Sequence, residues 1–139
     1  MDRDINDYFR EITQNIYLLL DKKLEKYGVV KGQAQLLLII RDNEGCTQKD
    51  LANYFNVKYS SMSERISKLE NAGFIKRIHE DGNFKNNRIY ITREGKLIST
   101  QCRKILKDFD KKLYAGFSKK DISQLEENLL KLIDNTKSE

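Results

Sequence analysis

The segment that most constrains the fold is a pair of helical patterns separated by a tight turn. Residues 47–57 predict a short helix and the turn, and residues 58–73 predict a second helix. Thr47 can cap the first helix, because Asp50 stands three residues later, where its carboxylate can accept from the amide of the cap. Gly73 is placed to end the second helix. The pattern therefore predicts a helix-turn-helix.

A predicted β-hairpin follows these two helices. Residues 74–78 and 88–92 have strand patterns, and the polar loop 79–87 joins them. A helix-turn-helix with a basic hairpin attached is a winged helix. Its second helix fits the major groove of DNA, and its hairpin can reach the neighbouring backbone or minor groove. Double-stranded DNA is therefore the expected partner.

Amphipathic helices are predicted on both sides of this module. Apolar residues recur at steps of three and four over residues 5–27, 98–113 and 122–133, and residues 33–42 predict a short buried helix. The chain contains no proline that would break these helices. We therefore predict a mainly α fold with a small β-hairpin wing, that is, a winged helix-turn-helix flanked by dimerisation helices.

The predicted domain organisation follows from the same stripes. We expect one domain over residues 1–139, with the DNA-binding winged helix at 33–93 and dimerisation helices at 1–30 and 94–139. The outer stripes offer more apolar surface than a winged helix of this size can cover, and such stripes mark an interface. A homodimer with two-fold symmetry is expected.

Positive charge is concentrated on the predicted module. The formal net charge of the chain is +5. Residues 45–93 hold nine Lys/Arg against five Asp/Glu, a net charge of +4, whereas residues 1–44 have a net charge of −1 and residues 94–139 of +2. A phosphate-binding surface requires such a distribution. The total charge alone would fit an ordinary solvated surface equally well.

The residue inventory argues against an enzyme. One histidine and two distant cysteines give no catalytic triad and no metal site, and the seven glycines lack phosphate-loop spacing. We therefore expect no catalytic residues, no metal and no cofactor. The longest apolar run, residues 36–40, is too short to cross a membrane, and the first residues do not resemble a signal peptide. A cytoplasmic location without membrane contact is expected.

The predicted second helix has one apolar face and one polar face. Met62, Ile66 and Leu69 follow the i, i+4, i+7 spacing and should be buried. The residues turned outward are then Ser60, Ser61, Ser63, Glu64, Ser67 and Lys68. The first turn of such a helix contacts base edges, and small hydroxyls permit close approach. Alternatively, the serines serve as caps, since Ser61 and Glu64 have capping-box spacing.

The start of the first helix is a second predicted contact with DNA. Thr47, Gln48 and Lys49 stand at a helix N-terminus, where free amides and the helix dipole attract anions, so we expect Thr47 and Gln48 to touch backbone phosphates. The complete set of predicted DNA-binding residues is Thr47, Gln48, Lys49, Lys58, Tyr59, Ser60, Ser61, Ser63, Glu64, Arg65, Lys68, Lys85 and Arg88.

The chain resembles the multiple antibiotic resistance regulator (MarR) family of bacterial transcription factors. The resemblance rests on Thr-Gln-Lys-Asp-Leu-Ala at 47–52, Val-Lys-Tyr-Ser-Ser-Met-Ser at 57–63, Leu-Glu-Asn-Ala-Gly-Phe-Ile-Lys-Arg at 69–77 and Ile-Tyr-Ile-Thr-Arg-Glu-Gly at 89–95. It implies a homodimeric repressor that presents two winged helices to a pseudo-palindromic operator. It also implies that a small-molecule effector or an oxidant relieves repression.

The wing departs from the pattern of the family. The family usually has an Asp-Arg-Arg-like wing tip, and the corresponding positions here are Asn83, Phe84 and Lys85. Lys85 or Arg88 can supply the charge, and Lys85 does so without the planar guanidinium. Glu64 also stands where an arginine is common, so operator preference does not transfer from relatives.

Cysteine and aromatic residues have two interpretations each. The helix start beside Cys46 could lower the pKa of its thiol, although a small half-buried side chain is the simpler interpretation. Cys102 lies on an apolar stripe and is expected in the core. Tyr17, Tyr27, Phe109 and Tyr114 could line an effector cavity, whereas aromatic residues at helical spacing usually only pack.

Two other functions remain open at this level. The wing departures and Glu64 are compatible with a winged helix used for protein interaction, as in an antagonist of a related regulator. Nucleoid-type binding without sequence preference is the other alternative. Binding to DNA that weakens steeply with salt excludes the first, and discrimination between promoter and random DNA excludes the second.

Overall fold

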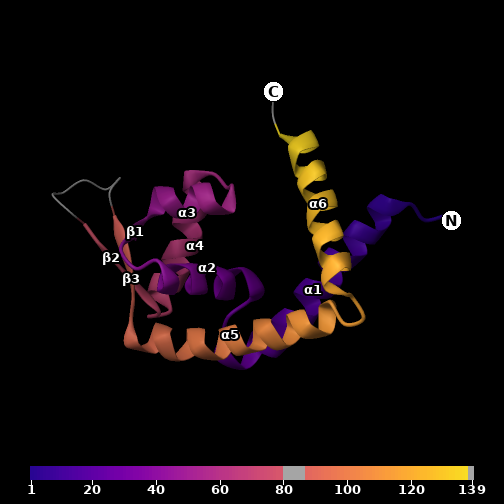
Figure 1. The fold of residues 1–139 in the computed structure, drawn as a ribbon. Helices are drawn as coiled ribbons and strands as arrows, with labels where there is room; N and C mark the ends of the chain where they lie inside the picture. Colours follow the sequence, from indigo (N-terminus) through magenta and orange to yellow (C-terminus); the bar gives the residue numbers. More distant parts are fainter. Residues whose placement is uncertain (80–86, 138–139) are drawn as a thin grey trace. The chain divides into compact units, whose positions relative to one another are not determined.

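The computed structural model describes residues 1–79 and 87–137. Its elements are α1 (Ile5–Leu24), the 3-10 helix η1 (Glu25–Tyr27), α2 (Lys31–Asp42), β1 (Cys46–Thr47), α3 (Gln48–Phe55), α4 (Tyr59–Asn71), β2 (Ile75–Ile78), β3 (Arg88–Ile91), α5 (Arg93–Leu113) and α6 (Lys119–Thr136) (Figure 1). The chain forms two compact units, residues 1–107 and residues 108–139, and α5 begins in the first and ends in the second.

The first unit contains the predicted winged helix. Helices α2, α3 and α4 and the sheet share one hydrophobic core, to which α4 contributes Met62, Ile66 and Leu69, each completely buried. The turn between α3 and α4 is closed by Asn56, which adopts the left-handed conformation with φ of 52°. Gly73 follows α4 with φ of 84°, a conformation in which a side chain would be strained. The predicted fold class and the inward face of α4 are confirmed.

The sheet has one strand more than we predicted. Its strand order is β1-β3-β2, with antiparallel pairing of Cys46 with Ile89 and of Ile75 with Ile91. A two-residue strand such as β1 is too short to show a period of two in the sequence. The Gly45 amide extends the pairing by donating to the carbonyl oxygen of Ile89 at 2.8 Å.

A tight junction connects the sheet to α5. The Thr92 amide donates to the carbonyl oxygen of Phe74 at 3.0 Å, and the Thr92 hydroxyl donates to the carbonyl oxygen of Gly73 at 2.7 Å. The same hydroxyl accepts from the Gly95 amide at 3.0 Å, so it caps the start of α5. These contacts give the Thr-x-x-Gly motif a structural role, because they hold the first turn of α5 against the turn that follows α4.

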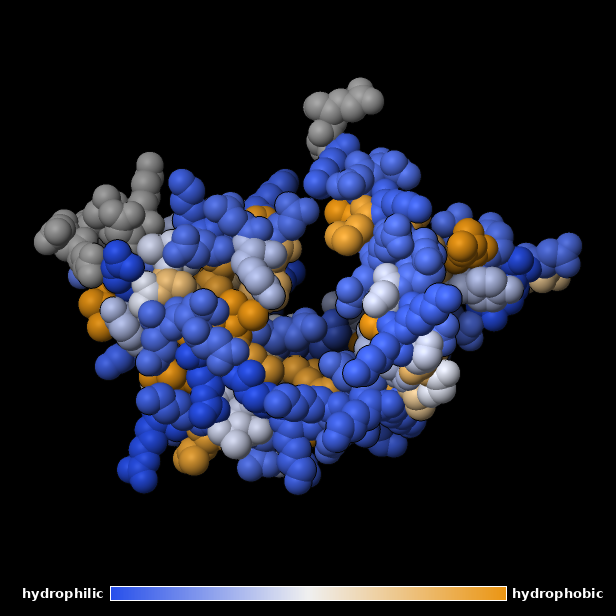
Figure 2. Space-filling model, viewed as in Figure 1, coloured by the Kyte–Doolittle hydropathy of each residue, from blue (hydrophilic) through white to orange (hydrophobic). Residues whose placement is uncertain are grey.

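Apolar side chains are exposed on helices outside the core. On α1 they are Ile5, Tyr8, Phe9, Ile12, Tyr17, Leu18 and Leu19, and on α6 they are Leu129, Leu130, Leu132 and Ile133. Figure 2 shows hydrophobic residues interrupting the hydrophilic surface along α6 and near the beginning of α1. Helix α6 starts with the predicted capping box between Ser118 and Asp121. Within the described residues, no helix is both long enough and apolar enough to span a lipid bilayer.

Candidate nucleic-acid interface

Helix α3 begins with a complete capping box. The Asp50 amide donates to Thr47 Oγ1 at 3.1 Å, and the Thr47 amide donates to Asp50 Oδ2 at 3.0 Å. Lys49 is exposed in the same first turn. The helix start is therefore fixed in direction and presents an exposed cation, which suits the predicted contact with a phosphate.

Gln48 occupies a different environment from the one that we expected. Its side chain is only 1% exposed, and its Oε1 accepts from Arg77 Nη1 at 3.3 Å. In the described structure this side chain therefore points into the protein rather than toward a phosphate. Its predicted contact with DNA is untested. Gln48 is buried because its partner Arg77 lies on β2. The residues around Gln48 in the sequence give no sign that its side chain is buried rather than exposed.

We expect the Asp50 carboxylate to make the stability of the winged helix depend on pH in the acidic range. The hydrogen bond from the Thr47 amide lowers the pKa of the Asp50 carboxyl, and the Thr47 hydroxyl and the charges of Arg88 and Lys49 act in the same direction. A carboxyl group with a lowered pKa stabilises the fold at pH values above its ordinary pKa of 3.8. This stabilisation is lost as the pH falls through the lower pKa of the carboxyl group in the folded protein.

The Asp50→Asn variant should therefore lose less stability than the wild type between about pH 5 and pH 3. Urea unfolding at several pH values measures this difference. An identical pH dependence in the two proteins would contradict the assignment.

The first turn of α4 presents polar groups without a side-chain cap. Lys58 is the N-cap residue, and no side chain makes the capping hydrogen bond, so the capping-box alternative for Ser61 and Glu64 is wrong. Ser60 and Glu64 are exposed, and Ser61 is half-buried. Because no cap occupies these hydroxyls, they remain available to a groove of DNA. Lys58 and Tyr59 are exposed beside them.

The remaining predicted residues of α4 lie on two flanks. The backbone carbonyl of Ser63 accepts from Arg77 of β2, so this flank faces the sheet. Arg65 and Lys68 are exposed on another flank, where they border a pocket. The structure therefore separates Ser63 from Arg65 and Lys68, whereas the sequence did not divide the outward face of this helix into flanks.

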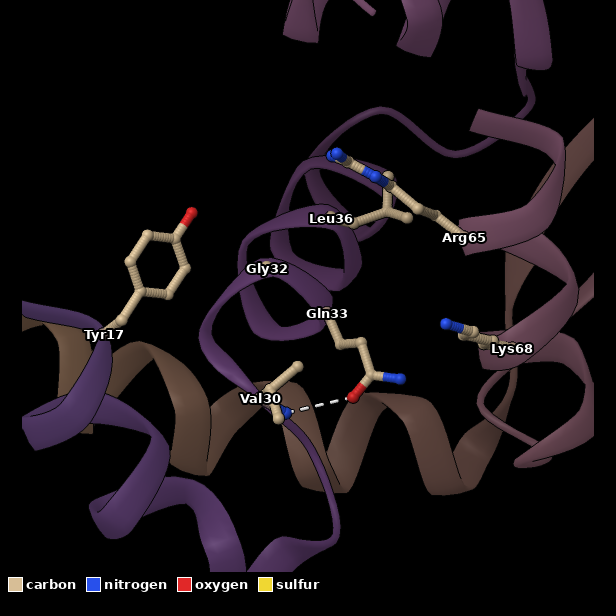
Figure 3. A pocket seen from close by; sticks show the side chains of 7 residues that line it. All are labelled: Tyr17, Val30, Gly32, Gln33, Leu36, Arg65 and Lys68. Atoms are coloured by element: carbon tan, nitrogen blue, oxygen red, sulfur yellow. Dashed lines mark hydrogen bonds between the residues drawn. The ribbon is translucent and has the colours of Figure 1, made fainter. Parts of the chain in front are cut away.

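The pocket has a volume of about 200 Å³ and lies within the first unit. It is lined by Tyr17 of α1, by Val30, Gly32, Gln33 and Leu36 around the start of α2, and by Arg65 and Lys68 of α4. Figure 3 shows the two cations extending from α4 toward α2, with the Tyr17 ring on the opposite side. The ammonium group of Lys31 lies 4.6 Å from the centre of that ring.

This pocket overlaps only partly with the expected effector cavity. Tyr17 lines it, whereas Tyr27 is not among its lining residues and its hydroxyl lies 3.3 Å from Gln101 Oε1 in a hydrogen bond. Phe109 and Tyr114 belong to the second unit, and their role in a cavity stays a prediction. The sequence did not indicate that Arg65 and Lys68 would border the pocket.

The described part of the wing supports the sheet. Arg88 is half-buried, and its Nη1 donates to the carbonyl oxygen of Gly45 at 2.9 Å, which ties β3 to the segment before β1. Its predicted contact with DNA is untested. Lys85, Asn83 and Phe84 lie outside the described residues.

Both cysteine thiols lie in surroundings that raise their pKa. Burial raises the pKa of the Cys46 thiol, and the charge of Asp50 raises it further, so the alternative of a lowered pKa is wrong. Cys102 is completely buried, as predicted, and burial raises its pKa as well. Neither thiol therefore has the lowered pKa of a reactive cysteine.

Comparison with known proteins places these features in a family. The model of the MarR family matches residues 29–86. The chain is 30% identical over 104 residues to the uncharacterized HTH-type transcriptional regulator YybA of Bacillus subtilis (strain 168), covering 72% of this chain and 69% of that protein. It is 25% identical over 118 residues to the HTH-type transcriptional regulator BilQ of Clostridioides difficile (strain CD3), covering 85% of this chain and 80% of that protein.

Solved structures have the same fold. The transcriptional regulator SlyA is 26% identical with a TM-score of 0.85, covering 96% of this chain and 94% of that chain. MepR of S. aureus, solved in complex with DNA, is 21% identical with a TM-score of 0.89, covering 98% of this chain and 100% of that chain. Since the family model and the 30% identical relative agree with this fold, the chain belongs to the MarR family of transcriptional regulators.

Proposed function

We propose that this protein regulates transcription as a homodimer that binds a pseudo-palindromic operator and represses the genes behind it. The observation that supports this most directly is the start of α4, whose inward face is fixed in the core while its uncapped hydroxyls stay available to DNA. Relatives named as transcriptional regulators, and MepR in its complex with DNA, support the same function.

The proposed contacts with DNA differ between α3 and α4. Thr47 and Lys49 at the start of α3 anchor backbone phosphates, whereas Ser60, Ser61 and Glu64 in the first part of α4 face base edges. The other proposed contacts are Lys58, Tyr59, Ser63, Arg65, Lys68, Lys85 and Arg88, whereas the Gln48 side chain is left out because it is buried against Arg77. Residues 33–93 thus form the reading module of one domain that spans residues 1–139.

The proposed dimer is formed by residues 1–30 and 94–139. The exposed apolar residues of α1 and α6 support it, because a monomer would leave them in water. A regulator of this kind acts on DNA in the cytoplasm, which is the location that we propose.

The pocket beside α4 is the proposed site for a small effector. Arg65 and Lys68 supply positive charge, and Tyr17 and Leu36 supply apolar surface. A ligand held there touches the helix that we propose to read the operator, so it can change how α4 meets DNA without any distant relay.

The test is DNA binding measured over a series of salt concentrations. A duplex selected from random sequence by the protein should bind more tightly than a scrambled duplex of the same length. Affinity should fall steeply with salt, because each neutralised phosphate releases counterions. Weak binding without a salt slope would favour a protein-interaction module, and equal affinity for both duplexes would favour nucleoid-type binding.

Lys49→Ala should lower affinity for both duplexes by similar factors and flatten the salt slope by about one ion per subunit. The matched control is Lys22→Ala on α1, an exposed residue that removes the same charge outside the winged helix. If the two variants have the same salt slope, Lys49 is not a phosphate contact.

A further inference from the structure

Arg77 joins three elements of the winged helix through one partly buried guanidinium. Its side chain lies on β2 and is 13% exposed. Nη1 donates to Gln48 Oε1 of α3 at 3.3 Å, and Nη2 donates both to the carbonyl oxygen of Ser63 at 3.3 Å and to Ser67 Oγ of α4. Glu70 of α4 accepts from the Arg77 amide at 3.2 Å, and its other oxygen lies 3.6 Å from Nε.

These contacts fix the start of α3 relative to the middle of α4. Gln48 is the first residue of α3, directly after the cap at Thr47. Ser63 and Ser67 lie one turn apart on α4, beyond its exposed first turn. The guanidinium therefore bridges the helix whose start is the proposed phosphate anchor and the helix that is proposed to read bases.

We propose that Arg77 is a positioning residue for sequence discrimination, and this inference rests on the proposed function. Phosphate contacts set the register of a protein on DNA, whereas base contacts specify the sequence. Discrimination between DNA sequences therefore depends on the distance between the proposed phosphate contacts on α3 and the proposed base contacts on α4. Arg77 holds that distance from inside the protein, because it contacts the Gln48 side chain of α3 and both backbone and side chains of α4.

The chemistry of the site requires arginine rather than any cation. The planar guanidinium presents several donors in fixed directions and can bond to α3 and α4 at once. A lysine in its place keeps the charge, but its single ammonium group cannot reach both sets of acceptors in the same geometry. Arg77→Lys therefore removes the bridge without changing the net charge.

The experiment compares the selected duplex with the scrambled duplex for wild type and Arg77→Lys, at a temperature at which circular dichroism shows both proteins folded. We expect the ratio of the two affinities to fall about tenfold, the effect of losing roughly one charge-assisted hydrogen bond. Affinity for the scrambled duplex and the salt slope should stay unchanged. Arg103→Lys is the matched control, because Arg103 on α5 pairs with Asp42 of α2 at 2.7 Å, outside α3 and α4. This control should keep the wild-type ratio.

Two other results would overturn the inference. An equal loss of affinity on both duplexes would make Arg77 itself a phosphate contact. Lower thermal stability with an unchanged affinity ratio would make it only a support of the fold. If the wild type itself does not discriminate between the duplexes, the proposed function fails rather than the role of Arg77.

The Gln48→Leu variant supplies a second readout, which also applies if Arg77→Lys does not fold. Gln48→Leu removes the acceptor on α3 with a side chain of similar size, and it should lower the affinity ratio by a similar factor. Combined with Arg77→Lys it should cause little further loss, because both changes break the same bridge. Losses that multiply in the double variant, or an unchanged ratio in Gln48→Leu, would contradict a bridge between the two residues.

Discussion

Gly95→Ala should lower the free energy of unfolding by about 3 kcal/mol or more, because the added methyl group has no space. A Cβ atom at this position would lie 2.1 Å from the carbonyl oxygen of Phe74 and 2.7 Å from Cγ1 of Ile91. The Phe74 oxygen cannot move away easily, since it accepts from the Thr92 amide that holds the junction together. Urea unfolding followed by circular dichroism measures the change.

Gly32→Ala is the matched control for this prediction. Gly32 also lies in the first part of a helix, but a Cβ atom there would meet nothing within 4 Å. Alanine in a helix reduces the conformational freedom of the unfolded chain, so this variant should be more stable by roughly 0.5–1 kcal/mol. If the two variants are destabilised equally, steric crowding at Gly95 is not the cause.

Leu129→Asp should convert the proposed dimer into monomers at micromolar concentration. Leu129 is 39% exposed on the apolar face of α6, and in a two-fold dimer one substitution introduces two carboxylates. Burying unpaired charges costs several kcal/mol, so the dissociation constant should rise by roughly a thousandfold, about 4 kcal/mol. Affinity for the full operator should fall with it, because each monomer then binds a half-site alone. Sedimentation and light scattering measure the mass.

Ser123→Asp adds the same charge to α6 at an exposed position that lies roughly 120° around the helix axis from Leu129. This variant should remain dimeric and keep its affinity for the operator. A wild-type protein that is already a folded monomer, or a Leu129→Asp variant with an unchanged mass, would rule out α6 as part of the interface.

Local signals in the sequence predicted most of the fold. The capping boxes at Thr47 and Ser118 depend on residues three positions apart. The turn at Asn56 depends on the tolerance of asparagine for left-handed backbone angles. Met62 and Ile66 are buried as their spacing requires, because helical periodicity places them on one side. Such features need no knowledge of distant parts of the chain.

Features that depend on contacts between residues far apart in the sequence were not predicted. Gln48 is buried because Arg77, far along the sequence, donates to it, and no local rule identifies that pair. Strand alternation gave a weak signal, since it places Arg77 on the same face of β2 as the buried Ile75. Glu64 and Ser61 have the spacing of a capping box, but α4 begins at Tyr59, so that spacing falls inside the helix.

The two cations beside the pocket would connect binding of the proposed effector with binding of DNA in a thermodynamic cycle. Arg65 and Lys68 project from α4 into the pocket, and both belong to the set proposed to meet DNA. An anion in the pocket and a phosphate outside it would compete for the same positive charge. By reciprocity, a ligand that weakens operator binding by some factor must itself be bound more weakly by that factor when the operator is occupied. The concentration of free operator sites would then set the apparent sensitivity of the regulator to its effector.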